Sequence, residues 1–175
     1  MTRTTYALDH ETPADWWEVE ALFDLCFAPG REALSSYRLR EGINPVGELC
    51  FVARDGDGTL AGAVRNWPVL CGSAPTLLLG PIAVHPTRQG EGLAAMLVGR
   101  CIADATKGGW QRILLVGDAP YYGRFGFGKL ADIRMPPPTN PDRVLGLALE
   151  TGAWGGIAGD VVRFDGIETP LASHR

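Results

Sequence analysis

Residues 83–97 read AVHPTRQGEGLAAML, and two glycines within them, Gly90 and Gly92, precede a helical pattern. The run TLLLGPIAV at residues 76–84 is mostly apolar, which is typical of a strand buried on both faces. After the glycines, apolar residues recur at every fourth position: Leu93, Leu97, Cys101 and Ala105. This spacing, with Gly108 and Gly109 as a stop signal, predicts a helix from about residue 92 to 107. The stretch therefore predicts a strand, a glycine turn and a helix in succession.

The glycine turn has the chemistry of an anion site. The first N–H groups of a helix have no partner inside it, and the helix dipole places partial positive charge there. Glycines leave room for a ligand beside those donors, and such turns bind phosphate groups. Arg88 adds a positive charge just before the turn.

Three phosphate-binding patterns compete for this turn. A Walker A loop ends in Gly-Lys-Ser/Thr, and Gly-Leu-Ala stands here instead, which excludes it. The dinucleotide pattern G-x-G-x-x-A matches Gly90 to Ala95, but HPTRQ separates it from the strand and the acidic Asp118 comes late. The acyl-CoA pyrophosphate pattern, Gln/Arg-x-x-Gly-x-Gly/Ala, fits Gln89 to Ala94 at every specified position. A nucleotide-binding oxidoreductase is kept as a rival to acyl-CoA binding.

The rest of the chain predicts strands and helices around this segment. We expect strands at 4–9, 112–117, 144–150 and 159–165. We also expect one helix that begins at Pro13, a second helix at 31–41, and a β-hairpin whose turn is Asp55–Gly58. This order of elements indicates an α/β fold with a mixed sheet and helices on its faces. Gly80-Pro81 lies inside the strand 76–84, and pairing must be interrupted there because proline donates no ladder hydrogen bond.

A second motif follows in GDAPYYGRFGFGKL, residues 117–130. Together with AVHPTRQGEGLAAML, it resembles the GNAT superfamily of N-acetyltransferases, over roughly residues 5 to 135. Within that superfamily it looks like a bacterial branch in which Tyr-Tyr precedes Gly-Arg-Phe-Gly-Phe. The resemblance implies a GNAT-like acyl-CoA N-acyltransferase fold, whose two central strands splay apart. It also implies acetyl-CoA as co-substrate and a primary amine as acceptor.

The resemblance implies a binding site for acetyl-CoA on two segments. The splayed strands would be 76–84 and 112–117, with the pantetheine arm in the gap between them. The backbone of Ile82, Ala83 and Val84 would pair with that arm. The turn that binds the pyrophosphate would comprise Gln89, Gly90, Glu91, Gly92, Leu93, Ala94 and Ala95.

The same resemblance implies a general acid and leaves the general base open. Tyr122 stands four residues before Gly126-Phe127, where the superfamily commonly carries the tyrosine that protonates the leaving thiolate. A phenol of pKa near ~10 is protonated at neutral pH and can donate a proton.

Many members carry a glutamate on the first splayed strand as the general base, but TLLLGPIAV has no carboxylate. His85 or a chain of water molecules is left as the base. Many members also carry an asparagine after the second splayed strand that contacts the pantetheine arm; Asp118 stands there in this chain, with capping of the next helix as its alternative role. The missing carboxylate favours a second reading, a non-catalytic acyl-CoA-binding module on the same fold.

Composition limits the remaining classes. The 175 residues, 46% hydrophobic and 21% charged, predict one domain over 1–175, with a core at about 5–135 and C-terminal strands at about 144–166. The net charge of −4 argues against a general nucleic-acid binder. No apolar run approaches membrane-spanning length and no signal sequence is evident, so we expect a cytoplasmic protein. Four scattered cysteines and three isolated histidines predict no metal site. A homodimer is expected only by analogy with relatives.

Overall fold

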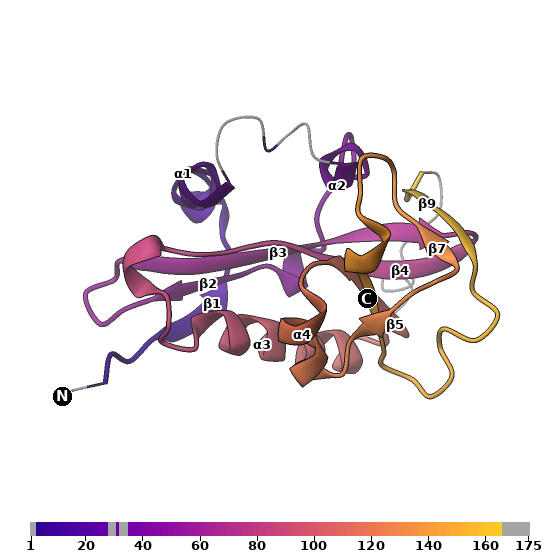
Figure 1. Ribbon diagram of the computed structural model, residues 1–175. Helices are drawn as coiled ribbons and strands as arrows, with labels where there is room; N and C mark the ends of the chain where they lie inside the picture. The colour runs from indigo at the N-terminus through magenta and orange to yellow at the C-terminus, as the bar shows by residue number, and fades with distance from the viewer. Residues whose placement is uncertain (1–2, 28–30, 32–34, 166–175) are drawn as a thin grey trace.

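A computed structural model describes residues 3–27, 31 and 35–165 (Figure 1). Its strands are Ala7–His10 (β1), Phe51–Arg54 (β2), Leu60–Cys71 (β3), Ala74–Val84 (β4), Arg112–Val116 (β5), Gly128–Lys129 (β6), Ile133–Arg134 (β7), Val144–Ala148 (β8) and Gly159–Arg163 (β9). Its α-helices are Trp16–Phe27 (α1), Ser35–Arg38 (α2), Leu93–Lys107 (α3) and Ala119–Tyr122 (α4). Short 3-10 helices span Pro13–Asp15, Gly47–Leu49, Pro86–Arg88, Gly123–Phe125 and Pro141–Arg143.

The strands form one mixed sheet in the order β1-β2-β3-β4-β5-β8-β6. Neighbours in this order are antiparallel except for β4 and β5, which are parallel. The long strand β3 pairs with β2 near its start and with β9 near its end, and β9 in turn pairs with β7. This confirms the expected α/β architecture with a mixed central sheet.

Helices cover both faces of the sheet. Figure 1 shows α1 and α2 on one face and α3 on the other. The predicted stripe of α3 is the part that packs against the sheet: Leu93, Leu97, Cys101 and Ala105 are at most 1% exposed. The periodic spacing read from the sequence therefore places α3 correctly, and its first turn is fixed at the edge of the sheet where β4 ends.

The two central strands separate shortly after they meet. Pairs between β4 and β5 form only at Leu77 with Ile113 and at Leu78 with Leu114. Beyond them β4 continues to pair with β3, and β5 continues to pair with β8. The register of β4 against β3 shifts across Gly80-Pro81, so β4 carries the expected interruption at the point of separation. The splayed strands predicted from the resemblance are thus present.

Local boundaries differ most from the sequence expectations in two places. The helix expected at 31–41 forms a regular turn only at α2, and residues 32–34 lie outside the described part of the chain. After α2 the chain tightens, because Arg40 N donates to Tyr37 O and Ile43 N donates to Arg40 O, which carries Leu39 and Arg40 into buried positions. The first strand lies at 7–10 rather than 4–9.

Candidate active site

The glycine turn presents uncapped backbone donors. Gly90 and Gly92 have φ of +81° and +82°, in the left-handed region that favours glycine. Gly92 is the N-cap of α3, and no side chain caps the helix. Its carbonyl accepts from Met96 N at 3.1 Å, so the N–H groups of Leu93, Ala94 and Ala95 have no acceptor within the helix. A Cβ at either glycine would meet no heavy atom within 4 Å, so the space beside these donors is open.

A cavity of about 560 Å³ lies in front of these donors, and we call it the cradle cavity. It is lined by Ile82, Ala83, Val84, Arg88, Gln89, Gly90, Gly92, Leu93, Ala94, Ala95, Tyr121, Tyr122 and Arg124. Every site residue predicted from the sequence lines it except Glu91. The exposed carboxylate of Glu91 accepts a hydrogen bond from Tyr6 Oη at 2.7 Å.

Two arginines differ sharply at this cavity. Arg88, the residue expected to add charge to the turn, is already engaged: its Nη2 donates to Asp55 Oδ2 at 2.5 Å and its Nη1 donates to Tyr6 Oη at 3.2 Å. Arg124 stacks its guanidinium 4.4 Å from the centre of the Tyr121 ring and has no ion pair within the described residues. Sequence patterning did not favour Arg124, because the motif alone does not show that Gly123–Phe125 turns back towards α3.

The open edge of β4 offers further backbone groups. His85 N donates to Ala61 O of β3 at 2.8 Å. Peptide groups alternate between the two sides of a strand, so Ala83 also faces β3 while Ile82 and Val84 face the gap. The carbonyl of Val84 accepts from Cys26 Sγ of α1 at 3.4 Å. The groups of this edge that are oriented for a ligand are therefore those of Ile82 and the N–H of Val84.

The aromatic motif folds as a compact turn after β5. Asp118 caps α4, since its Oδ2 accepts from Tyr121 N at 3.2 Å, which is the capping role considered for it. The rings of Tyr121 and Tyr122 meet edge to face with centroids 5.0 Å apart, and Tyr122 lies 6.0 Å from the ring of Phe127. Burial raises the pKa of the Tyr122 phenol above its ordinary value, and the Tyr121 phenol adds to this effect. Tyr122 is therefore protonated at neutral pH.

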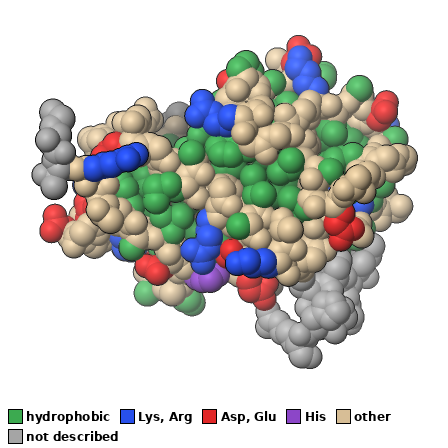
Figure 2. Space-filling model, turned by 90° about the horizontal axis from the view of Figure 1, so that it is seen from below, with side chains coloured by type: hydrophobic (Ala, Val, Ile, Leu, Met, Phe, Trp, Pro, Cys, Tyr) green, Lys and Arg blue, Asp and Glu red, His purple; other side chains and the backbone are tan. Residues whose placement is uncertain are grey.

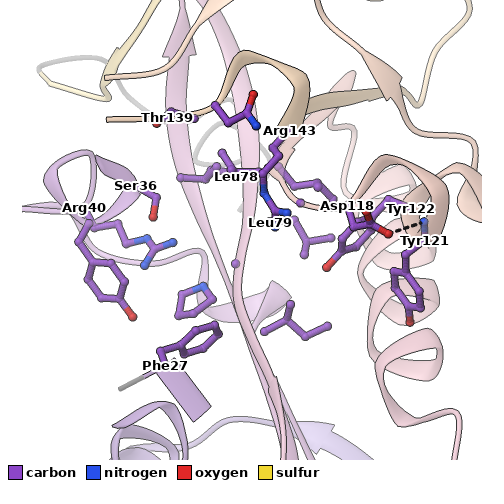
Figure 3. Close-up of a pocket in the computed structure, with 18 of the residues that line it drawn as sticks. Phe27, Ser36, Arg40, Leu78, Leu79, Asp118, Tyr121, Tyr122, Thr139 and Arg143 are labelled. Carbon is purple, nitrogen blue, oxygen red and sulfur yellow. Dashed lines mark hydrogen bonds between the residues drawn. The ribbon is translucent and has the colours of Figure 1, made fainter. Parts of the chain in front are cut away.

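A second cavity of about 560 Å³ lies on the other side of Tyr122, between the splayed strands and α2, and we call it the strand-gap cavity (Figure 3). Its lining includes Phe27, Ser36, Tyr37, Arg40, Leu78, Leu79, Gly80, Pro81, Ile82, Leu115, Val116, Gly117, Asp118, Tyr121, Tyr122, Pro138, Thr139, Asn140 and Arg143. Ile82, Tyr121 and Tyr122 line both this cavity and the cradle cavity. Tyr122 thus stands where the two cavities meet.

The sequence candidate for a base, His85, has another structural task. Its Nδ1 accepts from Thr87 N at 3.2 Å and lies 2.8 Å from Thr87 Oγ1, which caps the 3-10 helix Pro86–Arg88. It does not line either of the two cavities described above. The structure therefore separates His85 from the junction at Tyr122.

A third cavity, of about 530 Å³, is lined by residues of α1 and α2 among others, and it shares Tyr37, Arg40 and Pro81 with the lining of the strand-gap cavity. Its floor holds a charged network: Arg65 pairs with Glu11 at 2.7 Å and with Glu20 at 2.6 Å, and Arg31 pairs with Glu20. Burial opposes ionisation of Glu20, but the hydrogen bonds from Arg65 and Arg31 lower the pKa of its carboxyl overall. Glu20 is therefore held as an anion and is a poor proton acceptor.

The remaining features of the described residues that bear on function are metal sites, membrane-spanning helices, charged surfaces and disulfides. Among the described residues no group of three or more His, Cys, Asp or Glu side chains could hold a metal ion, and no helix has the length and hydropathy needed to cross a bilayer. On the face drawn in Figure 2, basic side chains are scattered between hydrophobic and acidic ones. The four cysteines are unpaired thiols, and three of them are buried.

Comparisons with known proteins agree with this geometry. The sequence model of the Acetyltransferase (GNAT) family matches residues 16–127. An uncharacterized N-acetyltransferase of Escherichia coli K12, YhbS, is 32% identical over 120 residues, which cover 67% of this chain and 70% of the relative. The crystal structure of YhbS in complex with CoA superposes with a TM-score of 0.80 at 28% identity, covering 93% of this chain and 92% of that one. A GNAT family acetyltransferase from Brucella melitensis in complex with acetyl-CoA gives 0.66 at 27% identity, covering 92% and 97%.

Proposed function

This chain belongs to the GNAT family of acetyltransferases, and from that premise we propose that it transfers the acetyl group of acetyl-CoA to a primary amine by direct attack, with Tyr122 as the general acid. The observation that carries the proposal is the position of Tyr122. Tyr122 lines both the cradle cavity and the strand-gap cavity, and burial raises the pKa of its phenol, which keeps the proton available for donation.

Acetyl-CoA is proposed to bind with its pyrophosphate in the cradle cavity. The open donors of Leu93, Ala94 and Ala95 support this placement, since unpaired N–H groups at a helix start favour phosphate oxygens. Gln89 and Arg124 would complete the phosphate contacts from the cavity wall. CoA-bound relatives with this fold supply independent support.

The pantetheine arm is proposed to lie along the open edge of β4, towards the junction. Ile82 and Val84 direct peptide groups into the gap, whereas the peptide groups of Ala83 face β3. Ala83 would therefore line the binding site without forming a backbone hydrogen bond to the pantetheine arm. The thioester would then lie beside Tyr122. The N–H of Val84 is proposed to polarise its carbonyl, because a donor aimed at the developing oxyanion stabilises the tetrahedral intermediate.

The reaction follows from these positions. The lone pair of a neutral amine in the strand-gap cavity attacks the thioester carbon and forms the C–N bond. The intermediate collapses with loss of the C–S bond, and the departing thiolate takes the phenolic proton of Tyr122. The amine loses its own proton to water, because His85 lines neither cavity and the Asp118 carboxylate caps α4. Tyr122 is reprotonated from solvent, which closes the cycle.

The experiment is an amine panel that follows thiol release from acetyl-CoA, with the N-acetyl product identified by mass spectrometry. Wild-type protein is expected to release thiol only when an acceptor amine is present. Tyr122→Phe should lower kcat by about 10²- to 10⁴-fold, the usual worth of a general acid, with little change in the Kd for acetyl-CoA. Tyr121→Phe removes a hydroxyl from the neighbouring ring and is the matched control. Binding of acetyl-CoA without turnover of any amine would favour the non-catalytic module instead.

A further inference from the structure

Arg40 is a buried cation that forms no ion pair with any described residue. It follows α2, and only 8% of its surface is exposed. Its Nε and Nη1 are buried, and neither has a hydrogen-bond partner in the part of the chain described. The guanidinium is held against aromatic rings instead, 4.3 Å from the centre of the Tyr37 ring and 5.8 Å from that of Trp67. Buried guanidinium donors are normally paired, so Nε and Nη1 are two donors for which a ligand could supply the acceptor.

The surrounding charges do not supply that acceptor. The carboxylates of Glu11 and Glu20 are taken by Arg65, and Glu20 is shared with Arg31. Asp24 binds Arg31 Nε at 2.7 Å. Burial lowers the pKa of Arg40 to about 10, and the nearby charges of Arg31 and Arg65 act in the same direction, but it stays charged at neutral pH.

The guanidinium of Arg40 faces the acceptor side of the proposed reaction site. Arg40 lines the strand-gap cavity and the third cavity together. A Cβ on Gly80, at the interruption of β4, would lie 3.9 Å from Arg40 Nη2. Figure 3 shows Arg40 reaching towards β4 from one side while Tyr122 lies on the other side of that strand. Both residues line the strand-gap cavity, so an acceptor in that cavity can contact the guanidinium while its amine points towards the side of Tyr122.

We propose that Arg40 binds a carboxylate of the acceptor, so that the substrates of this enzyme are small molecules carrying both a primary amine and a carboxylate. The inference rests on the acetyl transfer proposed above and adds the substrate class. A guanidinium presents a planar fork of N–H donors that matches the two oxygens of a carboxylate. A carboxylate bound there supplies the acceptor that Nε and Nη1 lack, and its negative charge offsets the buried charge of Arg40.

The test compares each amino carboxylate with its own carboxamide, over short, long and aromatic amino acids, by kcat/KM for thiol release. Wild-type enzyme should prefer at least one carboxylate over its carboxamide by about tenfold or more, the worth of hydrogen bonds to a charged group. In Arg40→Gln that ratio should fall to about one. Arg40→Lys keeps the charge without the fork and should give an intermediate ratio. Arg134→Gln, an exposed arginine paired with Asp160, is the control and should keep the wild-type ratio.

Thermal unfolding of each variant shows whether a loss of activity comes from a loss of folded protein. Arg40→Gln removes an uncompensated buried charge, so its Tm in the absence of ligand should equal or exceed that of wild type. Equal turnover of carboxylates and carboxamides by wild type, or an equal loss for both in Arg40→Gln, would overturn the inference while leaving acetyl transfer intact. If no amine is acetylated, calorimetric titration of the same amino carboxylates into the CoA-loaded protein decides the matter. Binding that Arg40→Gln abolishes supports the carboxylate site, and its absence in wild type overturns it.

Discussion

The ring of Tyr122 lies directly over the Cα of Gly117. A Cβ at position 117 would come within 2.4 Å of Tyr122 Cε2 and 2.8 Å of Cδ2, closer than such carbons approach one another. Gly117 directly follows β5, and its N–H donates to Arg143 O at 2.9 Å, so its backbone is fixed to the segment that leads into β8. The phenol is thus positioned by the end of the strand that diverges from β4.

This contact makes Gly117 a positioning residue for Tyr122. Gly117→Ala should push the ring away from the junction of the two cavities and lower kcat by about tenfold or more, because small displacements of a reacting group are costly. The double variant with Tyr122→Phe should be no slower than Tyr122→Phe alone, since the two changes remove the same contribution. Gly123→Ala is the control, because a Cβ there meets no atom within 4 Å. Additive losses in the double variant would show that Gly117 acts independently of the phenol.

The buried phenol also predicts a pH profile. Burial raises the pKa of Tyr122 above its ordinary value of 10.0, so the protonated, active form persists throughout the neutral range and beyond pH 10. The value of kcat should first rise with pH as the acceptor amine loses its proton, and should fall only above about pH 10. In Tyr122→Phe the alkaline fall should be absent. Circular dichroism at each pH separates this effect from unfolding, and an alkaline limb well below pH 10 would assign the proton to another group.

The sequence predicts those parts of the site that local patterning determines. The turn at Gly90 and Gly92, the start of α3 and the buried stripe of that helix all depend on residues within one segment, and each lies as expected. Gly80-Pro81 likewise indicated interrupted pairing in β4 before the divergence from β5 was known.

Other parts of the site depend on contacts between distant segments and could not be predicted. Arg40 looks like an ordinary charged residue of a short amphipathic helix, and its burial arises only when the chain after α2 closes over β4. The pairing of Arg88 with Asp55 joins two turns 33 residues apart and removes the cation first expected in the cradle. Arg124 takes its place only because the aromatic motif folds back towards α3.

Arg124 is therefore expected to contribute to acetyl-CoA affinity. Arg124→Gln should raise the Kd for acetyl-CoA by about tenfold at low ionic strength, because a cation on the cavity wall is lost. The ratio of variant to wild-type Kd should shrink as salt is added, since this cation is exposed and screened. Arg88→Gln should have the smaller direct effect, because that guanidinium is already bound to Asp55. A ratio that does not change with salt would indicate that Arg124 acts through packing on Tyr121.

Two glycines of the α3 segment give an internally controlled test of the cradle. Gly92 has a φ of +82°, so Gly92→Ala should lower the free energy of unfolding by about 1–2 kcal/mol. Its new methyl would meet no protein atom and would instead enter the space proposed for phosphate, so the Kd for acetyl-CoA should rise by about tenfold or more. Gly99 lies inside α3 with open space around it, and Gly99→Ala should raise stability by about 0.5–1 kcal/mol and leave the Kd unchanged. Denaturant unfolding and calorimetric titration measure both quantities. A Kd for Gly92→Ala that equals that of Gly99→Ala would show that phosphate does not bind at the start of α3.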